Sequence, residues 1–219
     1  MARAFNGTTD YIELGTGIRG TDVFKITVGA WIYLNTNNAE HTVIGRWDNT
    51  LNESWLLAIT NTGHTLFVIL ATDSNAYGAT GATVLSTGTW YHVGGTYDGA
   101  TVVTYVNGSV DASNTINKQM NNGLVTCRIG QHANSAYMDG RIAEVTIWLD
   151  TDNQALVFGA LAEGASVSQL DGMILHAKIG YWPLLGDDPE TDLSVGNPGT
   201  LHGTTYVDHP PVLSEMAFA

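Results

Sequence analysis

The spacing of carboxylates around four glutamates of this chain bears on whether the protein hydrolyses glycosidic bonds. Such hydrolysis uses two carboxyl groups, about 5–5.5 Å apart for retention and about 6.5–9.5 Å apart for inversion. On a β-strand, a second carboxylate two residues on would share the face of the first. None follows at that spacing after Glu40, Glu53, Glu144 or Glu163. The sequence therefore argues against a glycoside hydrolase, although carboxylates from distant segments remain an open route to such a pair.

Patterns for other chemistry are missing as well. There is no Gly-x-Ser-x-Gly turn to expose a nucleophile. The seven histidines have no His-x-His or His-x-x-x-His spacing. His92 is expected to be a packed, hydrogen-bonded core residue, with a ligand role as the alternative. Cys127, the one cysteine, is expected to be a small buried hydrophobe, and it excludes an internal disulfide and a cysteine zinc cluster.

Aromatic residues near predicted loops are candidates for sugar binding, because exposed rings stack on the apolar faces of sugars. Packing in the core or at an interface is the alternative for each ring. The candidate ligand-binding rings are Trp47, Trp55, Tyr77 and Tyr137. Four further tryptophans alternate within predicted strands and are expected in the core, namely Trp31, Trp90, Trp148 and Trp182.

Charge excludes two classes of partner. Eight Lys and Arg against 21 Asp and Glu give a formal net charge of −13. Binding to nucleic acid or to anionic lipid depends on cationic side chains, so neither is expected. No run approaches 18 consecutive apolar residues, so no membrane insertion is expected. Only 13% of residues are charged, about half the usual fraction of roughly 25%, while 44% are hydrophobic and can fill a core.

The elements that would position these residues are mostly short strands. Period-2 alternation runs between clusters of Gly, Asn, Asp and Thr. Asp98-Gly99 and Asn107-Gly108 are typical hairpin turns, because both dipeptides accept positive φ. The predicted strands are 10–14, 26–34, 41–46, 55–60, 66–71, 89–97, 101–106, 125–130, 140–149 and 179–184.

One segment breaks the β pattern. Residues 151–163 carry helix formers with apolar residues on one face, Asp152 as a start cap and Gly164 after the end, so they predict a short helix. Residues 187–199 read as a long loop. We expect one all-β domain over 1–206, an antiparallel two-sheet jelly-roll sandwich, and an extended C-terminal arm over 207–219.

Four segments resemble the concanavalin A-like lectin/glucanase superfamily, in its laminin-G-like and pentraxin-like branch. They are AFNGTTDYIELG at 4–15, ITVGAWIYL at 26–34, GTWYHVGGTYDGATVVTYVNGSVDA at 88–112 and MDGRIAEVTIWL at 138–149. The segment at 180–203 resembles a family strand that in many relatives comes first. The resemblance therefore implies a permuted order, in which a C-terminal strand completes the sheet. The Glu-x-Asp-x-x-Glu strand of the family's retaining glucanases is absent.

The resemblance also implies a structural calcium ion near the chain ends. Ala143 stands where the family strand usually has Asp, which removes one charged ligand. The pentraxin-like loop after the third strand is represented by Trp47, Asp48 and Asn49, with ion binding or an Asx turn as its two readings. Ordinary turn roles are the alternative for the candidate calcium ligands Asp10, Asp22, Asp139 and Asn197.

Three functions follow as hypotheses. The first is a bacteriophage virion surface component, either a capsid decoration or a tail-associated protein. It rests on the low-charge surface and on a start without the basic and apolar regions of a secretory signal. The second is a carbohydrate-binding lectin-like module, with an extracellular location as the alternative. The third, disfavoured, is a hydrolase. The expected partners are a second copy of the chain, a capsid or tail protein, and glycans.

Overall fold

Short antiparallel strands account for most of the regular structure. The computed structural model describes residues 1–18, 25–133, 135–149, 154–165, 167–170 and 178–210. The strands in this part of the chain are β1 (Ala2–Asn6), β2 (Tyr11–Gly15), β3 (Ile26–Leu34), β4 (His41–Gly45), β5 (Trp55–Ile59), β6 (His64–Leu70), β7 (Ala76–Val84), β8 (Trp90–Tyr97), β9 (Thr101–Val106), β10 (Ser109–Thr115), β11 (Cys127–Ile129), β12 (Asp139–Trp148), β13 (Lys178–Trp182), β14 (Thr200–His202) and β15 (Thr205–Val207). The helices are α1 (Gln154–Ala162) and a 3₁₀ turn, η1 (Val167–Leu170).

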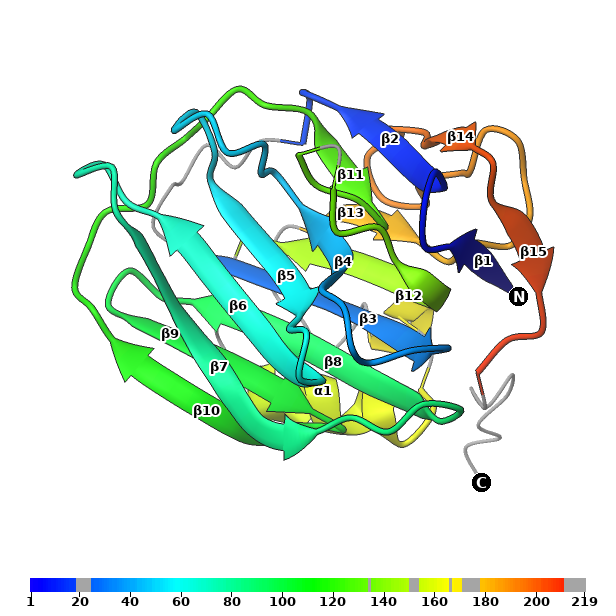
Figure 1. The fold of residues 1–219 in the computed structure, drawn as a ribbon, viewed down its shortest axis with the longest axis horizontal. Helices are drawn as coiled ribbons and strands as arrows, with labels where there is room; N and C mark the ends of the chain where they lie inside the picture. Colours follow the sequence, from blue (N-terminus) through cyan, green and yellow to red (C-terminus); the bar gives the residue numbers. More distant parts are fainter. Residues whose placement is uncertain (19–24, 134, 150–153, 166, 171–177, 211–219) are drawn as a thin grey trace.

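The strands form two antiparallel sheets that pack face to face as a jelly-roll sandwich (Figure 1). Sheet A has the order β10-β9-β8-β3-β12-β1-β15, and β13 also pairs with β12. Sheet B has the order β14-β2-β11-β4-β5-β6-β7. The all-β fold class expected from the sequence is confirmed.

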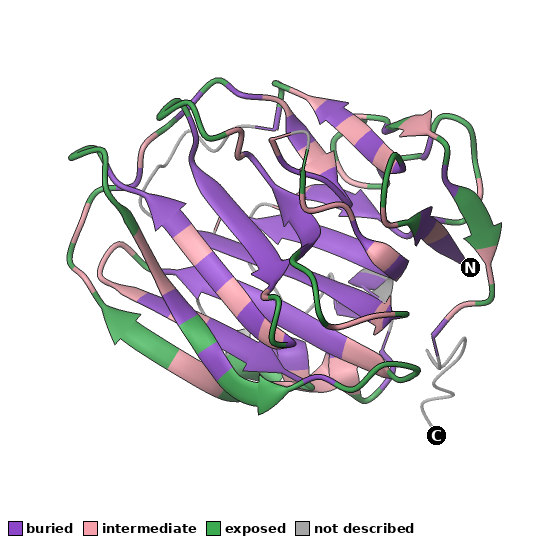
Figure 2. Cartoon of the chain, viewed as in Figure 1, coloured by how far each residue is buried: buried purple, intermediate pink, exposed green. Residues whose placement is uncertain are grey.

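The core lies between the sheets. Val28, Ala30 and Ile32 alternate along β3 and are fully buried in the main hydrophobic cluster. Trp31, which points to the other face of the same strand, belongs to a separate cluster with Ala2 and Ala143. Figure 2 shows burial concentrated in the central strands, with exposed residues along β7 and β10 at one edge. Sheet A therefore has an outer face that carries packed apolar residues of its own.

The predicted hairpin turns are confirmed. The Asp98 carboxylate accepts the backbone N–H groups of Ala100 and Thr101, and Gly99 has φ +95° between β8 and β9. Asn107 and Gly108, at φ +47° and +79°, connect β9 to β10. The ten predicted strands are present within a few residues. The sequence missed β1, β7, β10, β14 and β15.

Helix α1 lies on the outer face of sheet A, and Phe158 fixes it there. The Phe158 ring is fully buried against His92 and Tyr105. The helix ends in a Schellman pattern, with Ala165 N–H donating to the Ala160 carbonyl and Gly164 N–H to that of Leu161. The predicted helix and its glycine end are confirmed, whereas Asp152, the expected start cap, lies outside the described residues.

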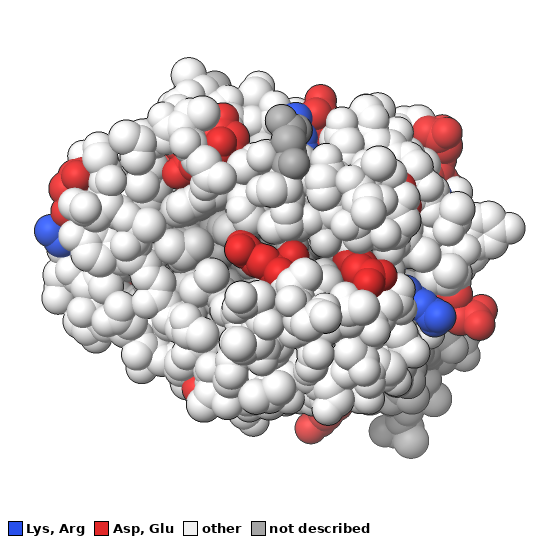
Figure 3. All heavy atoms as spheres, viewed as in Figure 1, with Lys and Arg blue, Asp and Glu red and all other residues white. Residues whose placement is uncertain are grey.

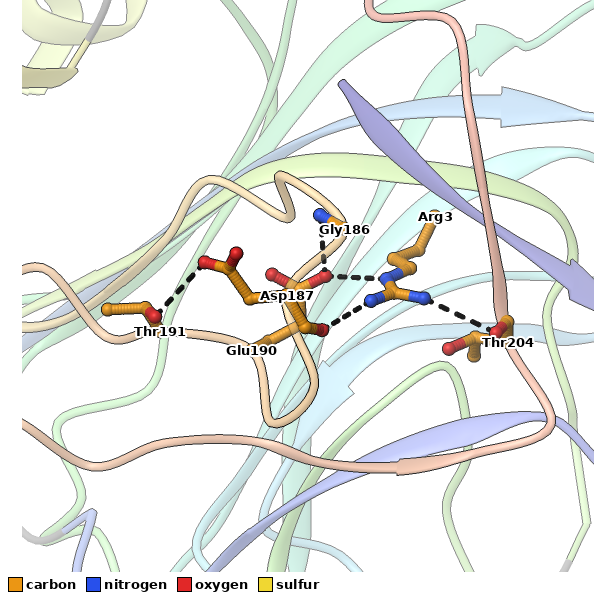
Figure 4. Close-up of polar contacts among 6 residues, drawn as sticks. All are labelled: Arg3, Gly186, Asp187, Glu190, Thr191 and Thr204. Atoms are coloured by element: carbon orange, nitrogen blue, oxygen red, sulfur yellow. Dashed lines mark hydrogen bonds and ion pairs between the residues drawn. The ribbon is translucent and has the colours of Figure 1, made fainter.

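The C-terminal segment adds strands to both sheets, whereas a single C-terminal strand completing one sheet was expected. β13 pairs with β12, β14 with β2, and β15 with β1. The Arg3 guanidinium joins this segment to β1. It donates to the Glu190 carboxylate at 2.5 Å and to the carbonyls of Asp187 and Thr204 (Figure 4). The arm predicted over 207–219 stays a prediction, because 211–219 lie outside the described residues.

Candidate functional site

A pocket of about 340 Å³ lies where three loops meet at one end of the sandwich. Gly7 follows β1, Glu40 precedes β4, and Ser135, Ala136 and Tyr137 come from the connection between β11 and β12. Gly7 N–H donates to the Met138 carbonyl at 2.9 Å, which closes the first loop onto the third. The fold thus brings together residues that are more than 100 positions apart in the sequence. We call this cavity the Tyr137 pocket.

The polar groups of the pocket are arranged for binding. Tyr137 is half-buried, while Glu40 and Ser135 are exposed. The buried His132 lies behind Glu40, with Nε2 3.9 Å from the Glu40 carboxylate and Nδ1 2.7 Å from the Thr42 hydroxyl. Burial lowers the pKa of His132, and the Glu40 charge only partly opposes this. The pocket therefore offers an aromatic ring, a hydroxyl group and an anionic acceptor backed by a neutral imidazole.

The backbone of the pocket loop is strained. Ala133 and Ala136 have φ values of +50° and +49°, in the left-handed region that residues with a Cβ rarely adopt. Thr42 N–H donates to the Ala136 carbonyl and Ser135 N–H to that of His132, so hydrogen bonds hold the loop in this shape. Such strain concentrates at binding sites, where the surrounding structure maintains it.

Comparisons with known proteins agree with the two-sheet sandwich described above. Residues 6–158 match the family model described as the concanavalin A-like lectin/glucanases superfamily. The chain belongs to this superfamily. No curated protein sequence matches the chain.

Solved structures of the superfamily fold agree. A candidate carbohydrate-binding protein of Bacteroides ovatus ATCC 8483 has 18% identity and a TM-score of 0.68, over 98% of this chain and 62% of its own. The native heptameric SAP-like pentraxin of Limulus polyphemus has 15% identity and a TM-score of 0.58, over 76% of this chain and 83% of its own. Domains LG4-5 of the mouse laminin α1 chain have 14% identity and a TM-score of 0.53, over 67% and 40%. The chain thus spans less than two thirds of the Bacteroides protein. The resemblance to laminin-G-like and pentraxin-like domains is confirmed at the level of the fold.

Two other candidate rings, Trp47 and Tyr77, lie near the end of β4 that is opposite the Tyr137 pocket. Loops 46–54, 71–75 and 117–125 meet there, tied by hydrogen bonds from the Arg46 guanidinium to the Gly123 carbonyl and from the Asn121 amide to the Leu51 carbonyl. We call these three loops the loop rim. It carries the half-buried Trp47, and Tyr77 lies at its edge with its hydroxyl 3.0 Å from the Asp73 carboxylate. The structure therefore separates these two rings from Tyr137.

Asp48 and Asn49 are engaged within the loop rim. The Asp48 carboxylate accepts the Thr50 N–H at 3.1 Å and the Thr50 hydroxyl at 2.5 Å, and the Asn49 side-chain oxygen accepts the Trp47 indole N–H at 3.0 Å. This is the Asx-turn reading that the sequence left open. The neighbouring Glu53 is buried, and burial raises the pKa of its carboxyl group.

Two expectations about tryptophans are wrong. Trp55 begins β5 and is 3% exposed in the main core, because its face of the strand points between the sheets. It cannot stack on a sugar. Trp90 is half-buried on the outer face of sheet A instead of lying in the core, because β8 turns this residue away from sheet B.

Three of the four expected calcium ligands take part in hydrogen bonds within the protein. Asp10 accepts the Asn6 N–H, and both Asp139 oxygens accept side-chain groups of Asn35 and Thr36. The main chain of Asn197 is also engaged, through its N–H to Asp192 and its carbonyl to the Trp182 indole. No three His, Cys, Asp or Glu side chains gather as metal ligands within the described residues, and Asp22 lies outside them.

Ala143 has a packing role in place of the family Asp. It is fully buried opposite Trp31, its neighbour across the β3–β12 ladder. A carboxylate there would be buried against an indole ring, so the alanine fits this outer face. No helix in the described part of the chain is long and apolar enough to cross a membrane.

Proposed function

We propose that the chain is a non-catalytic carbohydrate-binding domain that holds a sugar in the Tyr137 pocket. The observation that carries the proposal is that the Tyr137 ring, the Ser135 hydroxyl and the Glu40 carboxylate line one cavity. An aromatic ring with a few convergent polar groups is the usual composition of a sugar site. The Tyr137 ring would pack on the apolar face of the sugar, and Glu40 and Ser135 would bond its hydroxyl groups.

The composition of the pocket favours binding over hydrolysis. Among the described residues that line it, Glu40 supplies the one carboxylate, whereas glycoside hydrolysis needs two on either side of the bond. The nearby Asp139 carboxylate is already bonded to Asn35 and Thr36. The fold supports the same choice, since its solved neighbours include a candidate carbohydrate-binding protein.

A glycan array tests this proposal. Wild-type protein is expected to bind a defined set of glycans, and Tyr137→Ala should weaken that binding at least tenfold, because it removes the stacking surface. Tyr77→Ala is the matched control, since it removes a half-buried tyrosine from the loop rim and should leave binding unchanged. An array without signal, in calcium and in chelator, would sink the proposal. So would turnover of β-glucans by the purified domain.

We further propose that this binding operates on a bacteriophage virion, with the chain as a surface component. The surface supports this setting: Figure 3 shows a face that is mostly uncharged, with small acidic clusters and few cations. A net charge of −13 suits a partner surface that is neutral or basic. Immunogold labelling of purified source particles should decorate the capsid or tail. Unlabelled particles, with all of the chain free in the lysate, would contradict the proposal.

A further inference from the structure

A second cavity lies on the outer face of sheet A, beside helix α1. Its volume is about 470 Å³, against about 340 Å³ for the Tyr137 pocket. Its walls come from strands β3 and β8, from the turn between β9 and β10, and from helix α1. The lining residues used below are Trp31, Trp90, Asn107, Ser109, Gly159 and Glu163. We call this cavity the tryptophan cavity.

The walls of the tryptophan cavity are held by close packing. A Cβ on Gly108 would lie 2.6 Å from the Gly159 Cα, so the turn and the helix touch through two glycines. The Asn107 side-chain oxygen accepts the His92 N–H at 3.0 Å, which fixes the turn against β8. Phe158 anchors the helix on the sheet. The cavity is therefore present before any ligand arrives, which reduces the ordering cost of binding.

One residue that lines the cavity carries a buried donor without a partner in the described part of the chain. Trp31 is 4% exposed, and its Nε1 has no hydrogen-bond partner among the described residues. His92, edge-on to the Trp31 ring at 5.6 Å, is also unpartnered at both ring nitrogens. An unmet buried donor costs about 1–3 kcal/mol, so proteins rarely keep one without a reason. Trp31, which lines the cavity, and the adjacent His92 are therefore two buried rings whose polar nitrogens are unsatisfied within the part of the chain that the structure describes.

The remaining lining defines the ligand. The half-buried Trp90 offers a flat apolar surface, and exposed polar groups of Asn107, Ser109 and Glu163 face the same space. Because the Asn107 oxygen is occupied by His92, its Nδ2 amide group is the part that can donate to a ligand. A ring with an apolar face and several hydroxyl groups satisfies this set. The Glu163 carboxylate and the net charge of −13 disfavour an anionic ring.

We propose that the tryptophan cavity is a second binding site, specific for a neutral pyranose residue. The ring packs on Trp90, and its hydroxyl groups bond Asn107 and Glu163. The site shares no residue with the Tyr137 pocket and lies on the outer face of sheet A. The domain is therefore bivalent, and two sites on one rigid sandwich can engage one branched glycan or two neighbouring ones.

Two-dimensional ¹H–¹⁵N spectra of the indole N–H groups test this site directly in the wild-type protein. Titration with the methyl glycosides of glucose, galactose and mannose should shift the Trp31 and Trp90 indole signals for at least one sugar. The Trp47 signal, from the loop rim, should stay in place. Glucuronate should produce a shift at least tenfold weaker at equal concentration, because Glu163 repels it. Unchanged Trp31 and Trp90 signals with all three neutral sugars would overturn the proposal, and so would a stronger response to glucuronate.

Variants separate this site from the Tyr137 pocket. Trp90→Ala should abolish the indole shifts, and Glu163→Gln, an exposed change at the helix end, should weaken them several-fold without unfolding the domain. Trp47→Ala is the matched tryptophan control. Tyr137→Ala should leave the shifts intact, so weakened array binding with Tyr137→Ala together with retained indole shifts would support two separate sites. Loss of the Trp31 and Trp90 shifts in Tyr137→Ala would contradict a second site.

Discussion

Burial decides which side chains of this domain can change their protonation state. Burial raises the pKa of the Cys127 thiol to about 12, so it stays protonated in the core as the sequence suggested. Burial by itself would raise the pKa of Asp192. Hydrogen bonds from Tyr181, Asn197 and Ser194 outweigh this effect, so the pKa lies below its ordinary value. Asp192 thereby organises the 187–199 loop as an anion with every oxygen bonded.

The buried His92 affects the stability of the domain in acid. It is packed as expected, but its ring has no hydrogen-bond partner among the described residues, which corrects the expectation of a hydrogen-bonded histidine. Burial lowers its pKa to about 3. The unfolded chain takes up this proton below about pH 6.5 and the folded protein does not. The free energy of unfolding therefore falls as the pH drops from about 6.5 toward 3, and no loss occurs above that range.

The first prediction concerns His92→Leu, which replaces the neutral ring with an apolar side chain. Between pH 7 and pH 5, wild type should lose about 2 kcal/mol more unfolding free energy than the variant, at about 1.4 kcal/mol per pH unit. Urea unfolding at both pH values measures this. Comparing the two proteins cancels the titration of the remaining carboxylates. Equal losses in both would show that His92 is not a buried neutral base.

At the level of elements, two glycines determine where helix α1 sits. A Cβ on Gly94 would lie 2.5 Å from the Phe158 ring, and one on Gly29 would lie 2.9 Å from it. Phe158 thus rests directly on the backbone of β3 and β8. The helix covers part of the outer face of sheet A, and the tryptophan cavity lies beside it.

The second prediction is that Gly94→Ala destabilises the domain by about 1–3 kcal/mol, because the new Cβ would displace the closely packed Phe158 ring. Thermal or urea unfolding measures this. Gly159→Ala is the control in the same helix: its Cβ would meet nothing within 4 Å, and alanine favours the helix by up to about 1 kcal/mol. Gly94→Ala combined with Phe158→Leu should recover part of the loss. If Gly94→Ala and Gly159→Ala changed the free energy of unfolding equally, Phe158 would not pack directly on Gly94.

At the level of the whole molecule, one buried ion pair joins the start of the chain to its C-terminal segment. The Arg3 and Glu190 side chains are 5% and 1% exposed. Glu190 also accepts the Gly186 N–H, and Arg3 holds two carbonyls of the same segment. Removing one partner leaves the other charge buried without compensation, which is more costly than removing both.

The third prediction follows from this asymmetry. Arg3→Met should cost about 3–5 kcal/mol of unfolding free energy, and the double variant with Glu190→Met should recover most of that cost. A urea double-mutant cycle gives the coupling. Arg128→Met is the comparison, because the Arg128–Glu13 pair is partly exposed and should cost less than about 1 kcal/mol. If Arg3→Met were as mild as Arg128→Met, β1 would not depend on this pair.

Local patterns in the sequence were enough to predict the sandwich. Alternation identified β3 and β9 with their bounds, because the period of a strand is local and apolar residues face one side. The turn at Asp98-Gly99 needs only the conformational freedom of those two residues. The sequence AYGATGATV of β7 gave no such signal, because it carries few bulky β-forming side chains and pairs with β6 through its backbone.

The binding surfaces were decided by tertiary structure. Trp55 and Trp90 each begin a strand, yet one is buried between the sheets and the other borders a cavity, because strand pairing determines which face each residue joins. Tyr137 was identified as a candidate ring, but its partner Glu40 lies almost 100 residues away. Amino-acid composition and the two-residue alternation of apolar side chains were enough to determine the two-sheet sandwich. Only the packing of distant loops and the outer helix decided where it can bind, since those contacts depend on long-range pairing that no local pattern records.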